Sequence, residues 1–97
     1  MTLAEFRESL SLGGPSGSLS LALQSLWWME KGDWTRAHGL VDDADGADEC
    51  WVHAHLHRVE GDLANAEYWY RRARQPVAAS PLDAERALLI ATLLANR

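Results

Sequence analysis

The sequence lacks features that would assign it to several familiar classes of protein. It has a single cysteine, Cys50, in 97 residues, so it can form neither an internal disulfide framework nor a cysteine-rich zinc site. Its N-terminus, MTLAEFRESL, has no basic start, and no apolar run is long enough for a signal peptide or a membrane span. These absences predict a cytoplasmic protein that does not enter a membrane.

An excess of basic residues is also missing, since the net charge is −5. A protein that binds nucleic acid needs a positive surface to meet the phosphate backbone, so we expect no nucleic-acid partner. The charge is uneven: residues 1–50 carry nine acidic and three basic side chains, whereas residues 51–97 carry five acidic and six basic ones. This asymmetry would suit head-to-tail or dimeric association, although solvated faces explain it about as well.

The chain is instead rich in tryptophan and in helical patterns. Its 97 residues make one domain, and a domain of this size is either a compact bundle or is completed by a partner. Five tryptophans are many for this length. Because Trp combines a large apolar ring with one N–H donor, it suits packed helix seams and binding surfaces.

Glycine and proline mark the ends of the expected helices. Gly32-Asp33 and Gly61-Asp62 each join two helices, since Gly takes the left-handed position after one helix and Asp caps the next. The sequence therefore predicts an all-α domain with five to six short helices: an N-terminal helix in residues 1–12, hairpins in residues 18–44 and 47–74, and a C-terminal capping helix in residues 80–95. We expect the last helix to use Ser80 as its cap and to bury Leu82, Leu88, Ala91 and Leu94, or a neighbouring register.

The two expected hairpins repeat each other. A shift of 29 residues aligns Gly32-Asp33 with Gly61-Asp62, Ala37 with Ala66, Val41 with Tyr70 and Ala44 with Ala73. This G-D-x-x-x-A-x-x-x-(Val/Tyr)-x-x-A pattern resembles the second half of a tetratricopeptide repeat, over residues 19–76, although the period of that family is about 34 residues. Residues 51–73, WVHAHLHRVEGDLANAEYWYRRA, also resemble a small group of uncharacterised bacterial proteins.

The resemblance implies two antiparallel helical hairpins stacked against each other. Stacks of this kind usually need about three units or more. The two terminal helices or a second copy of the chain must therefore cover the open ends, and we expect a homodimer. Trp27, Trp28 and Trp34 are available for those seams.

One face of the helix before Gly61 is our predicted ligand site. Trp51, His55 and Arg58 recur there at i, i+4 and i+7. In tetratricopeptide-like hairpins this face lines the concave groove, and an aromatic ring beside a guanidinium suits an acidic or carboxylate-bearing peptide or small ligand. The alternative is a solvated helix edge with one Trp in a seam.

The next helix adds three residues to this predicted site. The aromatic residues 68–70 spread around the helix, so they cannot all face one core. The repeat alignment gives Tyr70 the core position and leaves Tyr68 or Trp69 for a neighbour or a ligand. Arg71 and Arg72 complement the C-terminal helix dipole, and with Arg58 they could bind an anion. The predicted ligand- or partner-binding residues are therefore Trp51, His55, Arg58, Tyr68, Arg71 and Arg72.

A different face of the same helix offers metal ligands. His53 and His57 are one turn apart, a spacing that can chelate a transition metal, and Glu60 could be a third ligand. The alternative is that both histidines pack against the second helix of their hairpin. His38 lies on another helix and could complete such a site, although the sequence does not place it there.

No residue set indicates catalysis, because Cys50 and the histidines do not form a nucleophile–base arrangement. We therefore predict a non-enzymatic protein-interaction or ligand-binding module without a cofactor, whose partner is a protein, a small acidic ligand or a second copy. The alternative function is a metal-binding protein, sensor or enzyme, that uses His53, His57 and Glu60. A third hypothesis is a structural subunit with an exposed apolar patch around Trp27 and Trp28.

Overall fold

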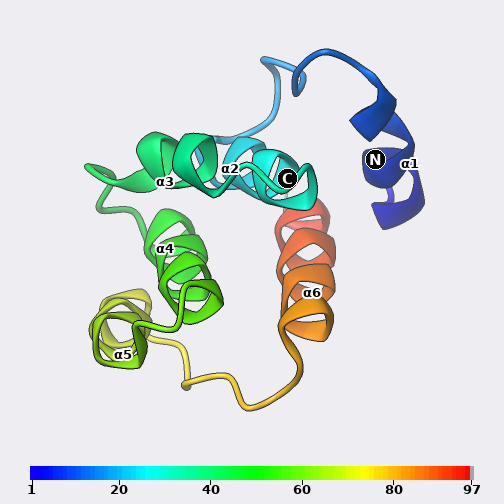
Figure 1. The fold of residues 1–97 in the computed structure, drawn as a ribbon. Coiled ribbons are helices and arrows are strands. Elements are labelled where there is room, and N and C mark those ends of the chain that lie inside the picture. Colours follow the sequence, from blue (N-terminus) through cyan, green and yellow to red (C-terminus); the bar gives the residue numbers. More distant parts are fainter. Residues whose placement is uncertain (97) are drawn as a thin grey trace.

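The computed structural model describes residues 1–96 and contains six α-helices and one short 3-10 helix (Figure 1). The elements are α1 (Leu3–Glu8), η1 (Ser9–Ser11), α2 (Leu21–Glu30), α3 (Trp34–Val41), α4 (Ala47–Val59), α5 (Leu63–Ala73) and α6 (Leu82–Ala95). The predicted all-α fold class with five to six helices is confirmed. Within the described residues, no helix has the length and apolar character needed to cross a membrane.

Two Gly-Asp turns build the helical pairs. Gly32 and Gly61 have φ values of 80° and 85°, the left-handed conformation that glycine adopts without a steric penalty. Asp33 and Asp62 then cap α3 and α5, each accepting a hydrogen bond from the backbone N–H three residues later. Consequently α2 packs against α3, and α4 packs against α5.

The main core lies where α2, α4 and α6 meet, with α1 covering its outer side (Figure 1). Its fully buried large side chains include Phe6 of α1, Trp27 of α2 and Leu89 of α6. Trp27 donates its indole N–H to Ser9 Oγ at 3.0 Å. Because Trp27 is buried and Trp28 packs edge-on against it, the exposed apolar patch expected around these two residues is not found.

The buried stripe of α6 differs from the one first expected. Leu88 is 59% exposed and Ala91 is exposed, whereas the buried residues are Glu85, Leu89, Ile90, Leu93 and Leu94. The helix starts at Leu82 with Pro81 in the cap position, so Ser80 is not the cap residue. The neighbouring register is therefore the correct one, and it turns Glu85 toward α4.

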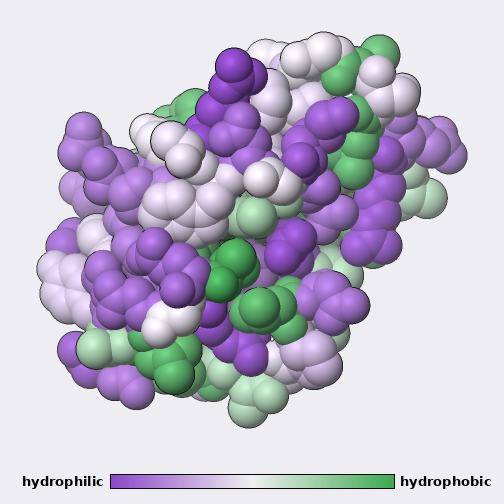
Figure 2. Space-filling view, in the orientation of Figure 1, coloured by the Kyte–Doolittle hydropathy of each residue, from purple (hydrophilic) through white to green (hydrophobic). Residues whose placement is uncertain are grey.

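The surface is mostly hydrophilic. On the face shown in Figure 2, hydrophobic side chains form small, separate clusters among hydrophilic ones. Large exposed apolar residues occur on several elements, and they include Leu12, Leu21, Leu63, Val77 and Leu88. Scattered exposed apolar residues are normal for a globular protein and do not by themselves mark an interface.

Candidate functional site

Helix α4 carries three histidines at alternating positions, so they lie on two different faces of the helix. His53 and His57 contact residues of α3 and α5, whereas His55 contacts α6. All three are at least nine-tenths buried: the exposed fraction is 2% for His53, 0% for His55 and 6% for His57. We call His38, His53 and His57 the histidine cluster, and His55, Arg58, Tyr70, Glu85 and Arg86 the glutamate network.

Glu85 is the centre of the glutamate network. Its carboxylate accepts hydrogen bonds from His55 Nδ1 at 2.7 Å, from Arg58 Nη1 at 3.0 Å and from the Tyr70 hydroxyl. Arg86 Nε donates to His55 Nε2 at 3.1 Å. An arginine N–H can only donate, so His55 Nε2 carries a lone pair and the His55 proton lies on Nδ1. Both ring nitrogens of His55 are therefore used within the chain.

The electrostatics of the network match this hydrogen bonding. Burial alone would raise the pKa of Glu85, but hydrogen bonds led by those from His55 and Tyr70 outweigh it and hold the pKa below its ordinary value of 4.5. Burial, together with the hydrogen bond to Glu85, raises the pKa of Tyr70 above its usual range. Glu85 is thus an ionised acceptor at neutral pH, and Tyr70 remains its donor.

The network covers part of the predicted ligand face. His55 is fully buried, so the expectation that it lines an open groove is wrong. Arg58 is bound to Glu85 and also donates to the Ser80 carbonyl oxygen. His55 and Arg58 are closed to a ligand because α6 and the segment before it fold over this face. That contact joins residues far apart in the sequence, so local patterns did not predict it. Trp51 remains partly exposed.

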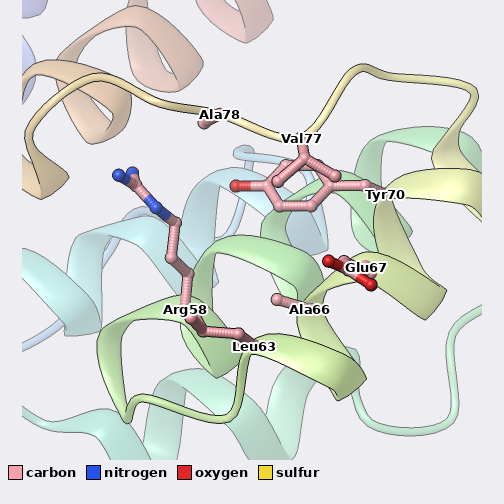
Figure 3. A pocket seen from close by; sticks show the side chains of 7 residues that line it. All are labelled: Arg58, Leu63, Ala66, Glu67, Tyr70, Val77 and Ala78. Atoms are coloured by element: carbon pink, nitrogen blue, oxygen red, sulfur yellow. The ribbon is translucent and has the colours of Figure 1, made fainter.

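Two cavities of about 280 Å³ each lie beside this covering segment. One is lined by Arg58, Leu63, Ala66, Glu67, Tyr70, Val77 and Ala78. In Figure 3 the Arg58 guanidinium and the Tyr70 hydroxyl lie at the same end of this cavity, with Ala78 above them. The other cavity lies beside Trp51, Pro76 and Leu88. At the first cavity, Arg58 and Tyr70 are already bound to Glu85, and we assign no ligand to either cavity.

The remaining predicted ligand residues lie on the surface of α5. Arg72 donates to the Tyr68 hydroxyl at 3.0 Å, and its guanidinium lies 5.1 Å from the centre of the Trp69 ring. Arg71 is exposed. Within residues 1–96, no hydrogen bond or ion pair joins these side chains to Arg58. Their role in binding a partner stays a prediction.

The histidine cluster brings together side chains from α3 and α4. His38 Nε2 and His53 Nε2 lie 3.2 Å apart and share a hydrogen bond, and one ring nitrogen from each of the three histidines lies within 4.8 Å of the others. Two nitrogens bound to one tetrahedral zinc ion at about 2.0–2.1 Å are themselves about 3.4 Å apart. The separation between His38 and His53 therefore suits a shared metal ion.

Two tryptophans enclose the cluster. Trp34 stacks on His38, with ring centres 4.7 Å apart and planes 9° apart, and its indole N–H donates to the Leu56 carbonyl oxygen at 2.8 Å. Trp69 stacks on His53 with ring centres 3.9 Å apart. These contacts fix the orientation of two imidazoles, and a metal site needs ligands held in this way.

Glu60 orients His57. The Glu60 carboxylate lies 2.6 Å from His57 Nδ1, and a carboxylate only accepts, so His57 Nδ1 is the donor of this hydrogen bond. An outer carboxylate holds a metal-binding histidine in this way. Glu60, which we considered as a possible third ligand, therefore contacts His57 from outside, and His38 is the third side chain of the cluster. His57, Glu60 and Asp62 form a second group within 4.8 Å, but both carboxylates are exposed and Asp62 already caps α5.

His53 is the least satisfied residue of the core. Among the buried side-chain nitrogens and oxygens of residues 1–96, His53 Nδ1 is the one without a hydrogen-bond partner. An unpaired buried polar atom costs roughly 1–3 kcal/mol. Burial, followed by the charges of His57 and His38, lowers the pKa of His53 from 6.5 to about 4. His53 is therefore neutral at neutral pH, the form of imidazole that binds metal ions.

No protein-family model, no curated protein and no solved structure matches the chain. The resemblance to tetratricopeptide repeats therefore stays a prediction, and function has to be inferred from the side chains. The sequence patterns did not identify Glu85 as part of a site, whereas they gave Trp34 a place in a helix seam and left Trp69 as an alternative to Tyr68 for a neighbour or a ligand. The short connection 42–46 between α3 and α4 was the available signal that His38 lies near α4, whereas nothing local distinguishes Glu85 from other acidic residues.

Proposed function

We propose that the protein binds a divalent transition-metal ion, such as Zn²⁺, through His38, His53 and His57. The observation that carries this proposal is the convergence of three imidazole nitrogens within 4.8 Å in a largely buried position. Imidazole is a suitable ligand for zinc, copper and nickel ions. A bound ion would join α3 to α4, and thereby one helical pair to the other.

Packing alone is a weaker explanation of the same cluster. Three imidazoles carry six ring nitrogens into a site where apolar side chains would have no hydrogen bonds to satisfy. The chain partners His57 Nδ1 through Glu60 but leaves His53 Nδ1 without a partner. The orientation of His57 by Glu60 would also serve a metal site, because a carboxylate bound to Nδ1 leaves Nε2 as the nitrogen that can face the ion.

A non-enzymatic interaction role remains a second candidate. Trp51, Tyr68, Arg71 and Arg72 all keep exposed surface, and the Arg72 guanidinium lies over the Trp69 ring. An aromatic and arginine-rich surface suits an acidic protein segment or a small acidic ligand. Self-association into a homodimer likewise stays a prediction.

Isothermal titration of Zn²⁺ into tag-free, chelator-treated protein tests the metal proposal. We expect one ion per chain in the wild type, and no saturable binding in His38→Ala or His53→Ala. His55→Gln is the matched control, because it changes a buried histidine of the same helix that lies outside the cluster. Circular dichroism of each variant establishes that it is folded. Zinc binding that is equal in the wild type and in both cluster variants would contradict the proposal.

A further inference from the structure

A carboxylate stands next to the histidine cluster at the end of α3. Asp42 is the residue that follows the last turn of this helix, and its Oδ1 lies 3.6 Å from His38 Nε2. That nitrogen is the one that faces His53. Asp42 and His53 therefore approach the same nitrogen of His38.

The position of Asp42 is unfavourable for ordinary helix stability. The C-terminal end of a helix carries partial negative charge, so an acidic side chain there is destabilising. The Asp42 side chain is 58% exposed, and it lies outside the group of three histidine nitrogens, so it would have to rotate toward the cluster to share an ion. A cation bound between the imidazoles would turn this unfavourable charge into a favourable one.

We infer that Asp42 is the fourth ligand, so that the complete site consists of His38, His53, His57 and Asp42. This inference rests on the proposed function. A nitrogen and an oxygen bound to one tetrahedral zinc ion at about 2.0–2.2 Å lie roughly 3.4 Å apart. The 3.6 Å between Asp42 Oδ1 and His38 Nε2 is close to this value.

A fourth protein ligand decides what kind of metal site this is. Structural zinc sites are closed by four protein ligands, whereas catalytic sites have three and leave one position for water or substrate. With Asp42 bound, no position is open for a substrate. The ion would then fix the end of α3 and the connection 42–46 onto α4, which makes the rigidity of this junction dependent on metal. The site is therefore suited to a structural or metal-sensing role.

Cobalt(II) is the probe for this inference, because its visible absorption reports the number and type of its ligands. We expect the wild type to give the intense spectrum of a four-coordinate ion, and Asp42→Asn to give an altered spectrum. Since even an outer partner of a ligand changes metal affinity roughly 10–100-fold, Asp42→Asn should weaken zinc binding at least about tenfold. Asp43→Asn is the matched control: it removes the neighbouring exposed acid and should behave as the wild type.

Added azide distinguishes a closed site from an open one. A closed site in the wild type leaves the cobalt spectrum unchanged by azide, whereas Asp42→Asn exposes a position that azide can occupy. If Asp42→Asn binds zinc and cobalt as tightly as the wild type, or if azide changes the wild-type spectrum, the inference about Asp42 is wrong while the histidine site stands. If the folded wild type binds neither ion, both the inference and the proposed function are wrong.

Discussion

Two buried polar clusters lie on different faces of α4, and they differ in how completely the chain satisfies them. In the glutamate network, the Glu85 carboxylate has three donors and both nitrogens of His55 are bonded. In the histidine cluster, His53 Nδ1 has no partner. The carboxylates that contact the other two histidines, Glu60 at His57 and Asp42 at His38, are 38% and 58% exposed.

Burial alone does not distinguish these clusters, since His53, His55 and His57 are all nearly inaccessible. The difference lies in how their polar atoms are arranged. A buried network that is satisfied internally fixes the arrangement of helices, whereas three imidazoles whose nitrogens lie within 4.8 Å of one another can share a ligand from outside. We therefore assign a structural role to the glutamate network and a binding role to the histidine cluster.

The largest effect should come from breaking the glutamate network. Glu85→Ala leaves the Arg58 guanidinium, the Tyr70 hydroxyl and the His55 N–H without their acceptor in the core. Removing one partner of a buried charge pair costs about 3–5 kcal/mol. Urea unfolding should show a loss of this size in the free energy of unfolding. A loss below about 1 kcal/mol would mean that the network does not hold α6 to α4.

Metal should produce the next largest effect, and only through the histidine cluster. An ion at 100 times its Kd stabilises the folded state by about 2.7 kcal/mol, which raises Tm by on the order of 10 °C in a domain of this size. Thermal unfolding with and without Zn²⁺ should show this rise for the wild type and none for His53→Ala. An equal rise in both proteins would place the bound ion elsewhere.

Matched substitutions in chelator compare the two clusters directly. His55→Gln removes an imidazole whose two nitrogens are both bonded, and should cost roughly 1–3 kcal/mol. His53→Gln removes an imidazole with one unpaired buried nitrogen, and it should lower the free energy of unfolding by less than His55→Gln does. Urea unfolding of the two metal-free variants measures the difference. A greater loss in His53→Gln would show that the histidine cluster is itself a stabilising feature of the fold.

The smallest expected effect is in the pH dependence of stability. The pKa of Glu85 is lower in the folded chain than its ordinary value of 4.5, so the unfolded chain binds its proton more readily. Ionised Glu85 therefore contributes stability that is present above pH 4.5 and is lost as the pH falls below it toward the folded pKa. Chelator-treated wild type should lose stability more steeply there than Glu85→Gln. Parallel curves would contradict the pKa shift.

Local features of the fold could be predicted from the sequence. The turns at Gly32 and Gly61 depend on a left-handed glycine and a capping aspartate, both of which are read from neighbouring residues. The existence and order of the helices follow from such signals. The spacing of four residues between His53 and His57 also predicted that they share a face of α4.

Long-range placement could not be predicted in the same way. The register of α6 decides that Glu85 is buried and Leu88 is exposed, and this choice depends on donors from helices distant in sequence. Because α6 covers His55, a face that we expected to be open became part of the interior. Likewise, the angle between α3 and α4 brings His38 to His53, and no local pattern encodes that angle.

Native mass spectrometry of protein purified gently, without a histidine tag or chelator and with zinc supplied, tests the central claim most directly. We predict the mass of the chain plus one divalent metal ion in the wild type and in His55→Gln, and the mass of the chain alone in His38→Ala and His53→Ala. A wild-type chain that carries no metal, or a metal ion that remains in both cluster variants, would contradict the assignment of the binding role to the histidine cluster.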